Sequence, residues 1–115
     1  MPRAKRGFKA RRRRKKVLKH ARGFYGARSR IFGDAVEQVR RAWRESYIGR
    51  RRKKRDFRRL WIIRINAAAR LHGMTYSKLM HRLKASDVAL DRKILADLAL
   101  RDPGGFKAVV DAVAG

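Results

Sequence analysis

Two runs of six consecutive basic residues, 11–16 and 50–55, have the most evident chemistry in this sequence. Arginine outnumbers lysine in both runs. An arginine guanidinium forms paired hydrogen bonds to phosphate oxygens and stacks on bases, whereas a lysine ammonium acts as a point charge. The two runs therefore indicate binding to a polymer that is rich in phosphate groups.

The second run favours folded RNA among such polymers. Six residues exceed one turn of an α-helix, so a helix over residues 50–55 presents charge in every direction. A helix on one face of a DNA duplex needs charge on one side only, whereas a helix inserted among several RNA backbones uses all sides. A solvated surface or a nuclear-localisation-like tract is the alternative for each run.

The basic charge is concentrated in the first half of the chain. Of the 34 Lys and Arg residues, 25 precede Leu60 and are accompanied by only four acids, a net charge of +21. Residues 60–115 carry nine bases and five acids. Charge of this density opposes compaction unless a partner neutralises it, and neutralised phosphates release counterions. We therefore divide the chain into a basic RNA-threading extension, residues 1–59, and a small globular helical domain, residues 60–115.

Aromatic residues are interleaved with the bases. Phe8, Phe24 and Tyr25 have no evident local core, so stacking on unpaired bases and packing against protein are weighed equally. Trp43 continues a helical apolar stripe and Trp61 adjoins two isoleucines, so packing is favoured for both.

Little in the sequence supports catalysis. The chain has no cysteine, and His20, His72 and His81 show no metal-ligand spacing. Gly104 and Gly105 follow a proline rather than a strand, which argues against a phosphate-binding loop. We expect no enzyme activity, no cofactor, no metal and no small-molecule substrate.

We also expect no membrane partner. Residues 1–19 are basic without an apolar core, and the apolar stretch 60–63 is cut by Arg64. A membrane-active cationic protein needs a sustained apolar face, which the all-round charge of residues 50–55 opposes.

The periodicity predicts an all-α fold. Ser29 is a plausible N-cap for a helix over residues 30–71, about 60 Å long, in which Gly49 is a possible kink and Gly73 a left-handed C-terminal stop. Its apolar stripe is formed by Phe32, Val36, Val39 and Trp43.

The flanking segments have their own signals. Residues 1–10 read as an unstructured arm, the run 11–16 as a short helix once neutralised, and Gly23 with Gly26 as a bend. Three short helices follow residue 73, with Thr75, Asp91 and Asp102 as N-caps.

The central segment resembles a known family. KRDFRRLWIIRINAAAR at residues 54–70 is similar to the signature of the bacterial and organellar large-subunit ribosomal protein family numbered twenty. The likeness extends to residues 1–3, 12–18, 23–29, 90–93 and 95–99, and residues 34–49 match more loosely.

The resemblance implies a structural protein that binds large-subunit ribosomal RNA (rRNA), contacts neighbouring ribosomal proteins and supports early subunit assembly, on a bacterial cytoplasmic or an organellar ribosome. Some members also repress their own messenger. A nucleoid-type DNA-binding protein is the alternative. The RNA contacts implied at matching positions are Arg11, Arg12, Arg13, Arg14, Lys15, Lys16, Lys19, Arg22, Arg28, Lys54, Arg55, Arg58, Arg59, Arg64, Asn66 and Arg70.

The all-round charge of the second run adds four residues to the predicted RNA contacts, Arg50, Arg51, Arg52 and Lys53. For Asn66, a bond from its amide to a base edge or ribose hydroxyl and a hydrogen bond inside the small domain are weighed evenly.

Overall fold

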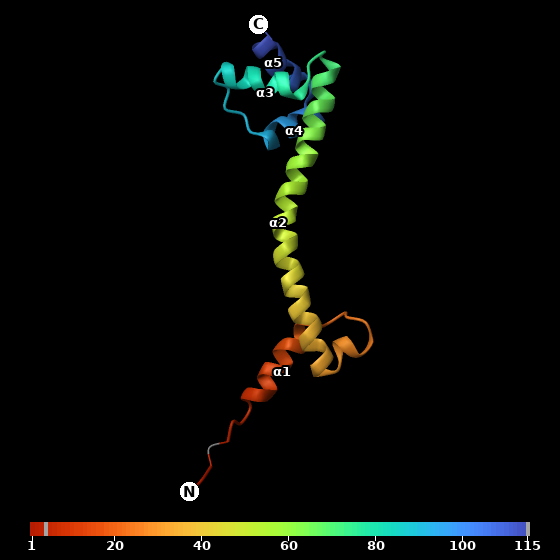
Figure 1. Ribbon diagram of the computed structural model, residues 1–115, viewed down its shortest axis with the longest axis vertical. Helices are drawn as coiled ribbons and strands as arrows, with labels where there is room; N and C mark the ends of the chain where they lie inside the picture. Colours follow the sequence, from red (N-terminus) through yellow and green to blue (C-terminus); the bar gives the residue numbers. More distant parts are fainter. Residues whose placement is uncertain (4, 115) are drawn as a thin grey trace. The chain divides into compact units, whose positions relative to one another are not determined.

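The computed structural model describes residues 1–3 and 5–114, and this part of the chain is helical with no strand. The predicted all-α class is therefore confirmed. The elements in order are α1 (Lys9–His20), the 3-10 helix η1 (Gly26–Ser29), α2 (Phe32–Leu71), α3 (Tyr76–Ala85), α4 (Arg92–Arg101) and α5 (Pro103–Ala114) (Figure 1).

Packing divides the chain into two compact units, Met1–Arg51 and Arg52–Gly115. The helix α2 supplies residues to both units. The division at residue 59, which rests on charge rather than on packing, stays a prediction.

The first unit packs α1 against the beginning of α2, as Figure 1 shows. Its small core consists of Ala21, Ala35 and Val39, all at most 1% exposed, with Val17 and Phe24 among the side chains packed on them. The chain reverses between the two helices through Gly23 and Gly26, whose φ angles of +86° and +60° suit glycine. The predicted bend is thus confirmed.

The second unit packs α3, α4 and α5 around the last turns of α2 (Figure 1). Trp61 packs against this core, as expected, and Gly73 ends α2 with a φ of +72°. The largest fully buried side chains of this unit are Ile65, Leu79, Leu95 and Phe106.

The three short helices begin at the predicted caps. The Thr75 hydroxyl accepts a hydrogen bond from the Lys78 N–H at 3.4 Å. The Asp91 carboxylate accepts one from the Ile94 N–H at 2.8 Å, and Asp102 accepts one from the Gly105 N–H at 2.9 Å. Each cap satisfies a donor that the first helical turn leaves free.

Two boundary predictions were wrong. Ser29 does not cap α2, because its hydroxyl donates to the Gly26 carbonyl at 3.0 Å within η1 and α2 begins only at Phe32. The unstructured arm is shorter than residues 1–10, because α1 begins at Lys9 and contains the first basic run. The possible kink at Gly49 does not interrupt the helix, since α2 continues through it to Leu71.

Candidate nucleic-acid interface

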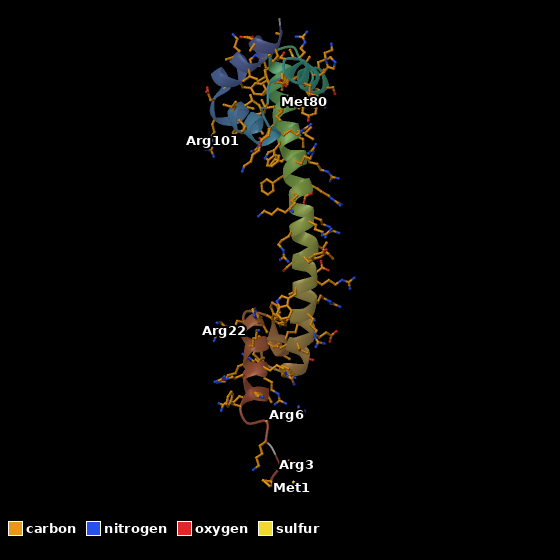
Figure 2. All side chains as sticks on the ribbon, turned by 90° about the vertical axis from the view of Figure 1, so that its left-hand side faces the viewer. Met1, Arg3, Arg6, Arg22, Met80 and Arg101 are labelled. Atoms are coloured by element: carbon orange, nitrogen blue, oxygen red, sulfur yellow. The ribbon has the colours of Figure 1, made fainter. Side chains whose placement is uncertain are left out.

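Residues 49–60 form a stretch of α2 in which every side chain is exposed. A helix normally buries an apolar stripe against the rest of its protein, and this stretch buries none. Eight of its residues are Lys or Arg and one, Asp56, is an acid. Figure 2 shows side chains projecting from both sides of this part of the ribbon. The stretch is therefore a bare cationic helix.

The charge surrounds this helix. Successive residues of an α-helix are about 100° apart around the axis, so four consecutive bases already point to all sides. Residues 50–55 are six consecutive exposed bases. The ion pair found among the described residues joins Arg101 to Asp97, both in α4. No base of the second run is paired with an acid in this part of the chain. Its positive charge is thus left for an external anion.

Two exposed aromatic rings flank the second run, and neither was predicted from the sequence to contact RNA. The Arg51 guanidinium lies 4.7 Å from the centroid of the Tyr47 ring, and the Lys53 ammonium lies 5.9 Å from that of Phe57. Tyr47 is 53% exposed and Phe57 is 44% exposed. In each pair the cation and the ring are four residues apart, which places both on one face of a helix. This spacing could have identified the two rings from the sequence.

The first run lies on the exposed part of α1. All six of its bases are exposed, while Val17 and Leu18, which follow them, are half-buried against the small core. The Arg14 guanidinium lies 5.6 Å from the centroid of the Phe32 ring. The same unit also exposes the predicted contacts Lys19, Arg22 and Arg28.

The three stacking candidates differ in their surroundings. Tyr25 is 92% exposed, and the Phe8 ring is covered on one face by the Arg12 guanidinium at 4.0 Å. Phe24 packs against the core of the first unit. Trp43, for which packing was favoured, meets the His20 ring edge-on at 5.5 Å between centroids.

The second unit holds the remaining candidates. Asn66 is half-buried, and its side-chain oxygen accepts a hydrogen bond from the Tyr76 N–H at 3.4 Å. This oxygen therefore has a partner inside the unit. The predicted cationic contacts on this part of α2, all exposed, are Arg52, Lys53, Lys54, Arg55, Arg58, Arg59, Arg64 and Arg70.

Other classes of site find no support in the described part of the chain. Within residues 1–3 and 5–114, no three His, Asp or Glu side chains are grouped so as to hold a metal ion. The same residues include no helix with the length and apolar character needed to cross a membrane.

Comparisons with known proteins all point to one family. The family model described as ribosomal protein L20 matches residues 3–109. The chain is 62% identical over 111 residues to the large ribosomal subunit protein bL20 of Syntrophotalea carbinolica, an alignment that covers 96% of this chain and 94% of that protein. It is 58% identical over 111 residues to the protein of the same name from Picosynechococcus, with 96% of each chain covered.

Proposed function

The chain belongs to the ribosomal protein L20 family, and we propose that it binds large-subunit rRNA directly and supports early assembly of the subunit. Proteins of this family are structural components of the ribosome and not enzymes.

The bare cationic helix at residues 49–60 is the observation that carries the proposal. This helix carries eight bases and one acid, and its bases point to all sides. It is therefore suited to a space enclosed by several phosphate backbones. Folded RNA provides such spaces, whereas an isolated DNA duplex offers one convex surface at a time. Each neutralised phosphate also releases condensed counterions, which drives binding entropically.

We assign the extension, residues 1–59, to threading through the RNA and residues 60–115 to a helical domain at its surface. The proposed contacts are the basic residues of α1 and of the second run, together with the cationic side chains on the last turns of α2. By joining RNA segments that are distant in sequence, such a chain favours their folded arrangement, which is a role in assembly. Neighbouring large-subunit proteins and the cytoplasmic ribosome of a bacterium are the proposed setting.

A messenger whose fold imitates the rRNA site would be bound by the same residues. The family resemblance motivates this second role, since repression of its own messenger then needs no further surface on the protein.

The proposal is tested by filter binding of the full chain to folded large-subunit rRNA and to duplex DNA at moderate salt. We expect a clear preference for the rRNA. Equal affinity for the two would contradict the proposal and would favour a nucleoid-type DNA-binding protein instead.

A further inference from the structure

A groove of about 360 Å³ lies in the first unit, where α1 packs against the beginning of α2 (Figure 1). We call it the α1–α2 groove. Most of its lining is apolar and comes from both helices, with an arginine added by each. The lining residues that matter here are Arg13 and Val17 of α1 and Phe32, Val36, Arg40 and Trp43 of α2.

The α1–α2 groove is the open side of the small core of this unit. Val39 is 1% exposed and belongs to the core, and it also lines the groove. Val17 packs on the core and lines the groove as well. The core itself is small, so apolar surface beside it is left uncovered, and Trp43 is 51% exposed. Covering this surface with another apolar group removes it from water, which favours association.

The charge of the groove is positive. Arg13 and Arg40 are both exposed, and the groove is lined by no acid of the described residues. Neither arginine forms an ion pair within this part of the chain. Arg40 also lies outside both basic runs, so none of the proposed RNA contacts uses it. An occupant that brings a negative group to the edge of the groove is therefore complementary to it.

An apolar side chain suits the floor of the groove better than a nucleobase does. The edge of a base carries hydrogen-bond donors and acceptors, and in the groove these would lie against Val17 and Val36 without partners. Burial of polar groups without hydrogen bonds is unfavourable. A second copy of this chain is also excluded as the occupant, because each copy has a net charge of +25.

We propose that the α1–α2 groove receives an apolar side chain from a neighbouring large-subunit protein, and that an acidic residue beside that side chain pairs with Arg40. This inference rests on the proposed function, which places the chain among such proteins. The inserted side chain packs against Trp43 and the two valines and completes the small core. The first unit is then held by a protein contact on this side, in addition to its contacts with RNA.

Photo-crosslinking in an assembled large subunit tests the insertion. An aromatic photo-crosslinker in place of Trp43 should crosslink to a ribosomal protein, in a segment that contains an apolar residue close to Asp or Glu. Position 44 is the matched control, since Arg44 is exposed, does not line the groove and lies about 100° further around the helix. Crosslinks from position 43 to rRNA, or to no partner, would overturn the inference. Equal yields of the protein crosslink from both positions would contradict insertion into the groove.

A charge exchange tests the ion pair. Arg40→Glu should abolish the protein crosslink from position 43, and a lysine in place of the partner's acidic residue should restore it. An unchanged yield with Arg40→Glu would show that this arginine has no acidic partner.

The salt dependence of RNA binding separates a carboxylate partner from a phosphate. Arg40→Gln in the full chain should leave the slope of log affinity against log salt unchanged on folded large-subunit rRNA. Arg11→Gln, at a proposed RNA contact, is the positive control and should lower this slope by about 0.7–0.9. The same decrease with Arg40→Gln would assign Arg40 to a phosphate and overturn the inference.

The inference and the proposed function can fail separately. A crosslink from position 43 to rRNA removes the inference, while the preference of the chain for rRNA over DNA still supports the proposed function. Loss of that preference would remove both.

Discussion

The side-chain oxygen of Asn66, in α2, accepts a hydrogen bond from the backbone N–H of Tyr76, the first residue of α3, at 3.4 Å. This bond joins the last turns of α2 to the next helix across the turn at Gly73. The first N–H groups of a helix have no partner within the helix, so Asn66 satisfies a donor that would otherwise be left open.

Removing this acceptor should destabilise the second unit. We expect Asn66→Ala to lower the free energy of unfolding by about 1 kcal/mol, because the half-buried Tyr76 N–H then loses its partner. Denaturant unfolding of the full chain checks this. Asn66→Asp, which keeps an acceptor oxygen, is the matched control and should retain most of the stability. Equal losses in both variants would mean that the bond contributes little.

The cap of α4 provides a second test of local stability. Asp91→Ala should cost about 1 kcal/mol, because the Ile94 N–H loses the carboxylate that now accepts it at 2.8 Å. Asp91→Ser, which preserves a capping oxygen, should lose much less. Thermal unfolding of the two variants side by side decides the point, and an unaltered midpoint for Asp91→Ala would argue against the cap.

Caps and stops were predictable because their signals are local. Asp91, Asp102 and Gly73 act within one turn of their own position, so their neighbours in the sequence suffice to identify them. Ser29 carries the same kind of signal and misled the prediction. Instead of accepting from a backbone N–H of α2, its hydroxyl donates to the Gly26 carbonyl, in a 3-10 turn that no apolar pattern in the sequence predicts.

Features that depend on packing between distant segments were not predictable. Val17 and Leu18 gave only a weak stripe, and the positions that complete their cluster, Ala35 and Val39, lie on α2. The surface pocket that Trp61 of α2 lines together with Lys93 and Leu98 of α4 likewise forms only when these two helices pack. The exposure of the basic runs, by contrast, was predictable without knowledge of the packing, because charged side chains are almost always exposed.

The helical domain, residues 60–115, should fold without the extension. Every side chain of its core cluster lies at residue 61 or later, and Ile65 is the first fully buried one. A fragment of residues 60–115 therefore retains the whole core. We expect it to show cooperative unfolding and helical circular dichroism while binding rRNA far more weakly than the full chain. A fragment without cooperative unfolding would show that the earlier turns of α2 are needed for this core.

Neutralising part of the second run should change binding and not stability. The triple variant Arg52→Gln, Lys53→Gln and Arg55→Gln should lower the slope of log affinity against log salt by about 2 to 3, at 0.7–0.9 for each phosphate contact. The three side chains are exposed, so the unfolding free energy should be unchanged or slightly raised by relief of repulsion.

The control for this variant removes the same charge elsewhere. Lys78, Lys84 and Lys107 are exposed lysines of the second unit outside the run. Replacing these three by glutamine should affect the slope much less. Equal effects of the two triple variants would mean that net charge, rather than the bare helix, determines RNA binding.

Photo-crosslinking inside an assembled large subunit shows whether RNA surrounds the bare helix. A crosslinking side chain placed singly at positions 51, 52, 53 and 54 samples the circumference of α2, since successive positions are about 100° apart. We expect crosslinks to rRNA from all four positions. Crosslinks to RNA from one side only, with solvent or protein at the others, would contradict it.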